Sequence, residues 1–313
     1  CLERECDTAR LYQAADRAAF LQEVGPGVRA LIGGGAVDAA LIAALPRLEL
    51  IASTAVGYEN IDVETAVTRG IIVTNTPEVL NDAVADLAFA LILGIERRVV
   101  AADAFVRSGK WPQGGFPYTR HLSDLTLGIL GLGRIGLVIA RRAEAFGMKV
   151  AYHNRHPRMD VPYTYHLDVL SLAQASDVLL CTVPGGAETR HLVDEEVLRA
   201  LGPEGTLVNI ARGSVVDEAA LVRCLQQGAL GAAALDVFEH EPLPADHPFW
   251  GMDQVIVSPH MSGDEEGWMQ ALGQQFAEEF HRWQEGEPLQ HVVKEAAACP
   301  AGGGSGRGPD DRE

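Results

Sequence analysis

The sequence lacks several features that mark other classes of protein. No apolar run is long enough to span a bilayer, and the first residues carry no basic-then-apolar signal pattern. Basic residues are too few to balance the acidic ones, 25 against 43, so the formal net charge is −18. Phosphate backbones and anionic lipid surfaces repel a chain of this charge. We therefore expect neither a nucleic acid nor a membrane among its partners.

Cysteine is scarce and shows no paired pattern. The five cysteines include no CxxC pair and no spacing typical of metal ligands, and their number is odd. Cys181 and Cys224 lie in apolar segments, where a cysteine is usually a small buried hydrophobe. This use of cysteine indicates a reducing, cytoplasmic location and gives no reason to expect a bound metal.

Most of the chain has the composition of an ordinary globular protein. With 47% apolar and 22% charged residues among 313, it is long enough for two domains. Residues 299–313 differ because they are rich in glycine and charge and lack aromatics, so we expect a disordered tail. The first residues resemble a helix end that leads to a short strand at Thr8–Tyr12. Because an α/β domain usually opens with a strand, we expect an earlier strand upstream of residue 1.

Two series of short apolar strands alternate with helical patterns, which predicts an α/β protein with parallel sheets. A long helix that begins at Asn81 and continues past Arg97 separates the two series. The expected strands are Arg29–Ile32, Leu48–Ser53 and Ile71–Thr74 in the first series, and Leu125–Leu130, Lys149–Tyr152, Asp177–Cys181, Thr206–Ile210, Ala232–Leu235 and Val255–Val257 in the second.

We predict two doubly wound parallel-sheet domains, with a Rossmann cofactor domain inserted into a flavodoxin-like substrate domain. The cofactor domain spans 96–264. The substrate domain is discontinuous, 1–95 plus 265–298, because a final helix at Glu265–Trp283 can return to the first series of strands.

The turn Gly131-Leu132-Gly133-Arg134-Ile135-Gly136 follows a predicted strand and opens a helix, which is the context that makes a GxGxxG motif informative. Gly131 permits the tight turn, Gly133 lets the backbone approach a pyrophosphate, and Gly136 lets helix and strand pack closely. At Arg134 and Ile135 the start of the helix offers N–H groups and a partial positive charge to phosphates. The sequence therefore predicts a bound nicotinamide dinucleotide.

The end of the next strand decides between the two nicotinamide dinucleotides. An acid there would bind the ribose 2′-hydroxyl of NADH, but residues 152–158 contain no acid. Arg155 instead offers a planar donor fork that suits a 2′-phosphate, and Asn154 adds neutral donors. We predict a preference for NADP(H), with NAD(H) as the alternative. The competing interpretation is that Arg155 and Arg158 are surface charges without a ligand.

Three ionisable residues, Arg212, Glu241 and His260, follow the carboxyl ends of three predicted strands. Ligands of an open α/β sheet bind outside these ends, so we expect the three side chains to converge beside the cofactor. Reduction of a 2-keto acid needs a cation for the carboxylate, a hydride source and a proton donor. Arg212 can bind the carboxylate with two prongs, and His260 titrates near neutrality. Glu241 can bond the far ring nitrogen and fix the tautomer.

Four ordered motifs together resemble the D-isomer-specific 2-hydroxyacid dehydrogenase family, and within it the NADPH-linked glyoxylate/hydroxypyruvate reductases. The resemblance extends from near the N-terminus to about the end of the last predicted helix. It implies that Arg212 binds the carboxylate and carbonyl of a small 2-keto acid, and that Glu241 and His260 form an acid–base pair. The motifs are Gly131–Gly136, Val208–Asp217, Leu235–Pro242 and Ser258–His260.

The resemblance implies further contacts. Asp236 would hold the nicotinamide carboxamide, and Pro184 would line the adenine pocket. Val56 and Gly57 would offer backbone N–H groups to the substrate carboxylate. Trp111 resembles a residue that reaches into the partner subunit's active site in some relatives, which implies a homodimer, although packing in a core explains this tryptophan equally well.

The leading hypothesis is reduction of glyoxylate or hydroxypyruvate to the D-2-hydroxy acid by NADPH. Met261 follows His260 where relatives usually have a small residue, so another D-2-hydroxy acid, such as lactate or phosphoglycerate, is the second interpretation. A third comes from a different class, because some proteins of this fold are dinucleotide-sensing binding modules. The complete set of Arg212, Glu241 and His260 and the strong negative charge favour an enzyme.

Overall fold

The computed structural model describes residues 6–264 and 266–293, so the tail predicted at 299–313 lies outside the described residues. Two compact units divide the chain. One is Leu80–Trp268, and the other combines Cys1–Val79 with Met269–Glu313. Within the described residues, every helix is too short or too polar to traverse a bilayer.

The smaller unit is built on a parallel sheet of three strands in the order β1-β2-β3. Its two faces are covered by different helices, because alternate side chains of β2 point to opposite sides. Ile51 packs with α2 and α3, whereas Leu50 packs with Phe276 and Phe280 of α10. The elements are β1 (Ala30–Gly33), α2 (Ala39–Ala44), β2 (Leu50–Ser53), α3 (Val63–Thr68), β3 (Ile72–Thr74) and α10 (Trp268–Glu285), preceded by η2 (Leu11–Gln13), α1 (Arg17–Val24) and η3 (Gly25–Gly27).

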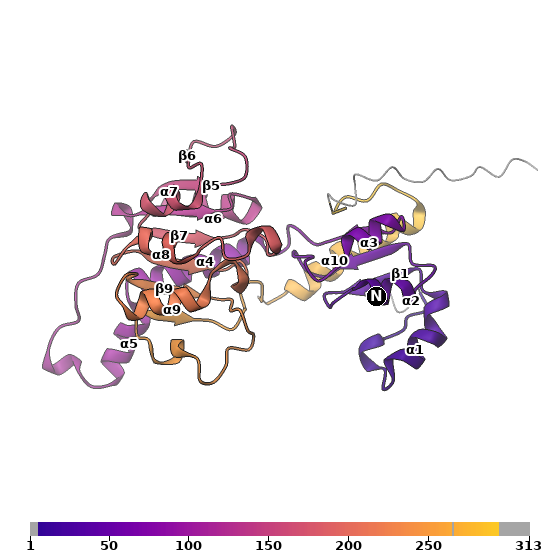
Figure 1. Cartoon of the computed structure of the whole chain (residues 1–313), viewed down its shortest axis with the longest axis horizontal. Helices are drawn as coiled ribbons and strands as arrows, with labels where there is room; N and C mark the ends of the chain where they lie inside the picture. Colours follow the sequence, from indigo (N-terminus) through magenta and orange to yellow (C-terminus); the bar gives the residue numbers. More distant parts are fainter. Residues whose placement is uncertain (1–5, 265, 294–313) are drawn as a thin grey trace, which may run out of the picture. The chain divides into compact units, whose positions relative to one another are not determined.

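The larger unit contains a parallel sheet of seven strands in the order β10-β9-β8-β7-β4-β5-β6 (Figure 1). The order reverses between β4 and β7, which is the switch point of a Rossmann sheet, and β10 extends that sheet by one strand. The strands are β4 (Thr126–Leu130), β5 (Lys149–His153), β6 (Thr164–Tyr165), β7 (Val178–Cys181), β8 (Thr206–Asn209), β9 (Ala232–Leu235) and β10 (Val255–Val257).

Helices cover both faces of this sheet, so its central strands are fully buried. One face packs on α4 and α6, and the other packs on α7, α8 and α9 (Figure 1). The prediction of an α/β protein with parallel sheets is confirmed. The helices are α4 (Asn81–Glu96), α5 (Val99–Arg107), α6 (Arg134–Ala145), α7 (Val169–Gln174), α8 (Glu195–Leu201) and α9 (Glu218–Gln226), with 3₁₀ turns η4 (Trp111–Gln113), η5 (Leu122–Asp124), η6 (Ala187–Thr189), η7 (Gly213–Val215) and η8 (Pro248–Gly251).

Several elements differ from the expectation. The strand expected at Thr8–Tyr12 is absent, and Leu11–Gln13 forms a 3₁₀ turn there instead. The smaller sheet has three strands within 6–264 and 266–293, whereas a flavodoxin-like order has five. The long helix does not continue past Arg97, because Arg98 adopts a left-handed conformation with φ 51° and a separate helix begins at Val99.

The place of α4 also differs from the expected domain limits. Its apolar residues, among them Val84, Ala88 and Leu91, pack in the same core as Ile139 and Ala140 of α6. This packing places α4 in the unit that begins at Leu80, whereas the sequence assigned residues up to 95 to the other domain. Apolar periodicity shows that a helix has a buried face, but it does not show which sheet buries that face.

Glu96, the last residue of α4, is a buried acid at the amino-terminal edge of the large sheet, with 6% of its surface exposed. Thr206 Oγ1 donates a hydrogen bond to Glu96 Oε1 at 2.6 Å, and Arg120 Nη1 lies 3.7 Å from Glu96 Oε2. Burial raises the pKa of Glu96, and Asp177 adds to this rise, while Thr206 and Arg120 oppose it. The charged form is therefore less stable in the folded protein than in the unfolded chain.

We predict that Glu96→Gln raises the free energy of unfolding at neutral pH. An acid whose folded pKa is raised destabilises the fold increasingly as the pH rises through its unfolded value, about 4.3, and fully above its folded value. Glutamine keeps an oxygen for Thr206 and carries no charge. Urea unfolding at about pH 8 and about pH 4 should show a gain at the higher pH that shrinks at the lower pH. Asp103→Asn, at an exposed ion pair on α5, should change little at either pH. A less stable Gln variant at neutral pH would show that Arg120 outweighs burial.

Candidate active site

The residues expected to form the site follow a single row of strand ends. His153, Leu130, Cys181, Asn209, Leu235 and Val257 pair in register across the large sheet, from β5 to β10. Because all these strands are parallel, the loops that follow the row emerge at one edge. Arg212, Glu241 and His260 follow β8, β9 and β10, and the glycine turn follows β4 at the same edge. The structure thus brings the sequence-predicted residues of this unit to the carboxyl ends of the strands, at one edge of the sheet.

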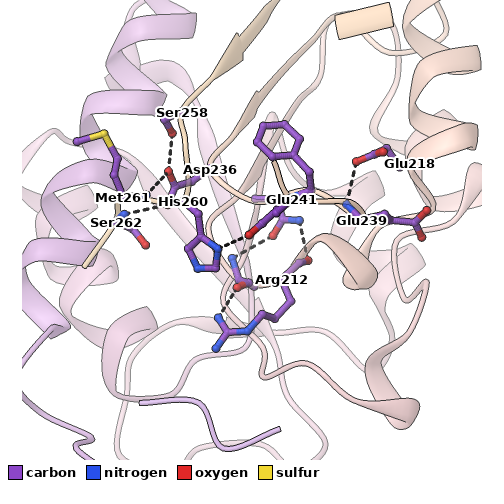
Figure 2. A network of polar contacts seen from close by, with 12 residues as sticks. Arg212, Glu218, Asp236, Glu239, Glu241, Ser258, His260, Met261 and Ser262 are labelled. Carbon is purple, nitrogen blue, oxygen red and sulfur yellow. Dashed lines mark hydrogen bonds and ion pairs between the residues drawn. The ribbon is translucent and has the colours of Figure 1, made fainter. Parts of the chain in front are cut away.

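His260 and Glu241 are joined by a short hydrogen bond. His260 Nδ1 lies 2.6 Å from Glu241 Oε2, and the two side chains are 44% and 34% exposed (Figure 2). The other oxygen of Glu241 accepts a hydrogen bond from the backbone N–H of Phe238 at 3.0 Å, so both carboxylate oxygens are occupied. An ionised carboxylate can only accept, so Nδ1 is the donor and Nε2 faces away from Glu241. This arrangement fixes the tautomer of the ring and leaves Nε2 as the nitrogen for a ligand.

The loop that carries His260 is fastened to Asp236, the residue that follows β9. Asp236 is fully buried, and its carboxylate accepts hydrogen bonds from Ser258 Oγ at 2.6 Å, Met261 N at 3.0 Å and Ser262 N at 2.9 Å (Figure 2). Its carbonyl accepts a further bond from His260 N at 2.8 Å. Asp236 therefore holds both sides of His260, whose backbone is left-handed with φ 53°. The contact expected for Asp236 with a nicotinamide carboxamide stays a prediction.

Arg212 is half-buried in the turn after β8. Asn209, which is 1% exposed, shapes this turn, because its Oδ1 accepts from Ala211 N and its Nδ2 donates to the Arg212 carbonyl, both at 3.0 Å. Arg212 Nη1 donates to the Ala211 carbonyl at 2.7 Å, which restrains the guanidinium. A restrained, planar cation at the same edge of the sheet as His260 and Glu241 suits a carboxylate ligand.

The glycine turn has the geometry of a dinucleotide cradle. Gly131 has φ 103°, and a Cβ there would lie 2.8 Å from Val183 Cγ1; a Cβ at Gly136 would lie 2.5 Å from the Gly131 carbonyl oxygen. By contrast, a Cβ at Gly133 would meet nothing within 4 Å. Gly133 is the N-cap of α6, and neither a capping side chain nor an acid occupies the first turn, which contains Arg134 and Ile135. The start of α6 is therefore open to a phosphate group.

The loop after β5 differs in part from the expectation. Asn154 faces the glycine turn, because its Oδ1 accepts from Leu132 N at 2.6 Å and its Nδ2 donates to the Leu132 carbonyl at 3.4 Å. Arg158 donates to the Leu132 carbonyl and pairs with Asp160, which raises the pKa of Arg158 through a hydrogen bond. Arg155 is the exposed cation, and it pairs with Glu188.

Other predicted contacts are accounted for individually. Pro184 lies on the exposed loop after β7, and its carbonyl accepts from Thr189 Oγ1 at 2.7 Å. In the smaller unit, Asn75 Nδ2 donates to the Val56 carbonyl at 2.7 Å and holds the loop that contains Gly57. The described residues contain no cluster of three or more His, Cys, Asp or Glu side chains arranged to hold a metal ion.

No role was assigned from the sequence to three residues of this edge. Asn209 and Ser258 hold loops, and each lies within three residues of a predicted site residue, so proximity in the chain could have suggested them. Glu188 had no such signal, because it pairs with a residue from a different loop.

Comparison with known proteins gives a consistent picture. The model of the D-isomer specific 2-hydroxyacid dehydrogenase, NAD binding domain, matches residues 89–262. Glyoxylate/hydroxypyruvate reductase A of Arabidopsis thaliana is 45% identical over 83% of this chain and 83% of its own. Hydroxyphenylpyruvate reductase of Plectranthus scutellarioides is 43% identical over 83% of this chain and 85% of its own. The crystal structure of NADPH-dependent glyoxylate/hydroxypyruvate reductase from Sinorhizobium meliloti with NADP and malonate has a TM-score of 0.82 at 38% identity, covering 93% of this chain and 89% of that one.

We predict that Asp236→Asn loosens the loop that carries His260. An asparagine presents one acceptor oxygen and one donor NH₂ to three donors, so at least one N–H of Met261 or Ser262 loses its partner. Amide hydrogen exchange should show protection at these two residues falling by about tenfold or more, the scale of a lost bond to a charged group. Ser258→Ala removes a single donor and should have a smaller effect. Unchanged protection in Asp236→Asn would show that other contacts hold this loop.

Proposed function

Because the chain belongs to the D-isomer-specific 2-hydroxyacid dehydrogenase family, we propose that it reduces glyoxylate or hydroxypyruvate to the 2-hydroxy acid with NADPH, in the D configuration where the product is chiral. The observation that carries the proposal is the His260–Glu241 pair at 2.6 Å, on the sheet edge that also bears Arg212 and the glycine turn. A dinucleotide-sensing module would not need this acid–base pair.

Each residue of the pair and its neighbours has a role in this reaction. The nicotinamide dinucleotide, when bound, supplies the hydride. Arg212 binds the substrate carboxylate and polarises the keto oxygen. His260, protonated on both nitrogens, donates the Nε2 proton to the oxygen as negative charge develops there. Glu241 stabilises the imidazolium and keeps the ring aligned.

The cofactor preference rests on the loop after β5. The family uses a nicotinamide dinucleotide, and the glycine turn and the open start of α6 fit its pyrophosphate. Residues 152–158 contain no acid for a ribose 2′-hydroxyl, and the exposed guanidinium of Arg155 suits a 2′-phosphate. We therefore favour NADPH over NADH, as in the Sinorhizobium meliloti relative, whose structure contains NADP.

A substrate panel tests this function. With NADPH, glyoxylate or hydroxypyruvate should give the highest kcat/KM, above pyruvate, 3-phosphohydroxypyruvate and hydroxyphenylpyruvate. Hydroxyphenylpyruvate is included because a relative at 43% identity is named for it. NADPH should exceed NADH in kcat/KM by about tenfold, because a charge-assisted bond to Arg155 is lost with NADH. The decrease in NADPH absorbance gives each rate.

Variants of two histidines provide the matched control. His260→Ala should lower kcat by about a hundredfold, the scale of general acid catalysis. His121→Ala should leave it unchanged, because His121 precedes β4 and lies toward the opposite edge of the sheet. Wild-type turnover in His260→Ala, or no reduction of any keto acid, would contradict the proposal.

The protein also carries an apolar surface suited to a second copy of itself. Five large apolar side chains are exposed in the segment between the end of α4 and the start of β4. A hollow of about 680 Å³ lies between α4 and α5, and its lining includes Leu93 and Val106. Large apolar side chains that are exposed close together in one segment suit an interaction surface. We propose that this segment forms the homodimer contact; its exposed residues are Val99, Val100, Val106, Trp111 and Tyr118.

We predict that Val100→Asp dissociates the dimer. A buried, unpaired carboxylate at the centre of an apolar interface should weaken association by at least about tenfold. Light scattering over a dilution series measures the change. Leu167→Asp, at a residue that is 82% exposed but lies outside this segment, should leave the dimer intact. A monomeric wild-type protein would contradict the dimer itself.

A further inference from the structure

An ion pair that the proposed reaction does not use joins two loops at the cofactor edge of the large sheet. Arg155 Nη1 lies 3.1 Å from Glu188 Oε2, and the two side chains are 85% and 82% exposed. Arg155 follows β5, and Glu188 belongs to η6 in the loop after β7. The cation assigned above to the 2′-phosphate of NADPH therefore already has an anionic partner from this chain.

The position of this pair follows from the sheet. β5 and β7 flank β4, and His153, Leu130 and Cys181 are in register at their ends. The loops after β5 and β7 therefore lie on either side of the glycine turn that follows β4. Both loops are held where they begin, because Asn154 bonds to Leu132 in that turn and Thr182 Oγ1 donates to the Leu130 carbonyl at 3.2 Å. The pair thus links two anchored loops across the strand whose turn would hold the dinucleotide.

We infer that Glu188 is a specificity-determining residue, which competes with the 2′-phosphate of NADPH for the guanidinium of Arg155. This inference rests on the proposed use of NADPH. A carboxylate and a phosphate both match the guanidinium fork, so each can take the place of the other. An exposed pair is weak, and a phosphate carries more charge than a carboxylate, so the phosphate prevails. Glu188 reduces the advantage in binding that the 2′-phosphate gives to NADPH.

NADH offers a contrast. Its neutral 2′-hydroxyl does not displace a carboxylate from a guanidinium, so the pair between Arg155 and Glu188 persists when NADH binds. Glu188 therefore penalises NADPH and leaves NADH nearly unaffected. The consequence is a moderate preference for NADPH rather than strict exclusion of NADH. The carboxylate of Glu188 determines how large this preference is.

Equilibrium binding measured by calorimetry tests this inference without turnover. Glu188→Gln should lower the Kd for NADPH by about fivefold, the upper range for an exposed ion pair, and should leave the Kd for NADH within about twofold. Adenosine 2′-phosphate, which carries the discriminating group alone, should follow NADPH. Glu204→Gln is the matched control, because Glu204 is an exposed acid before β8, at the opposite edge of the sheet. It removes the same charge and should change neither Kd.

A double variant, Glu188→Gln with Arg155→Gln, distinguishes failure of this inference from failure of the proposed preference for NADPH. In the Arg155→Gln background Glu188→Gln should have less than about a twofold effect on NADPH, because there is no guanidinium to compete for. Equal tightening of NADPH and NADH, or a gain that persists without Arg155, would overturn the competition. If Arg155→Gln weakens NADPH but Glu188→Gln does not strengthen it, only this inference fails. If Arg155→Gln leaves the Kd for NADPH unchanged, the proposed preference for NADPH fails as well, whatever the keto acid panel shows.

Discussion

The buried carboxylate of Asp236 is the constraint on which the geometry of the active site depends. An ionised group with no exposed surface is costly unless it is fully hydrogen-bonded, and all three of its donors come from residues 258–262. Burial of Asp236 therefore requires this loop to adopt one conformation. That conformation places His260 at φ 53°, a cost of about 1–3 kcal/mol. Bonds to a charged acceptor contribute about 1.5–3 kcal/mol each, so together they outweigh the strain and hold the ring toward Glu241.

The parallel sheet explains why residues far apart in the chain meet. Strand ends in register from β5 to β10 send every loop of the site to one edge, and the switch point between β4 and β7 leaves room for a ligand there. Short polar contacts then hold these loops in shape. Asn209 closes the turn that carries Arg212, and Asn154 joins the loop after β5 to the glycine turn. The geometry of the site thus depends on loops that are held in place by the rigid parallel sheet.

Sequence reasoning located the strands of the large sheet well, because buried parallel strands are short apolar runs between turn residues; the bounds of β9 and β10 agree at both ends. It also located Arg212, Glu241 and His260, since residues after strand ends share an edge. It did not find β6, which has two residues, nor the end of α4, where Glu96 turns into the core to meet Thr206. Contacts between different loops could not be predicted, because neither periodicity nor a local motif indicates them. Such contacts are made by Asp236, Asn154 and Glu188.

The negative net charge of the protein limits how its site can attract anionic ligands. A protein of net charge −18 repels both a keto acid and a dinucleotide phosphate at long range, so attraction must come from short-range groups. In the proposed function the chain supplies three such groups, which are Arg212, the start of α6 and Arg155. Two basic side chains at this edge have acidic partners of their own, because Glu241 hydrogen-bonds with His260 and Glu188 pairs with Arg155. Salt largely screens the interaction between exposed charges that are more than about 10 Å apart, so discrimination depends on which anion fits each cation in contact. In the proposed function, contact geometry at single guanidinium groups, rather than overall potential, therefore selects the ligand.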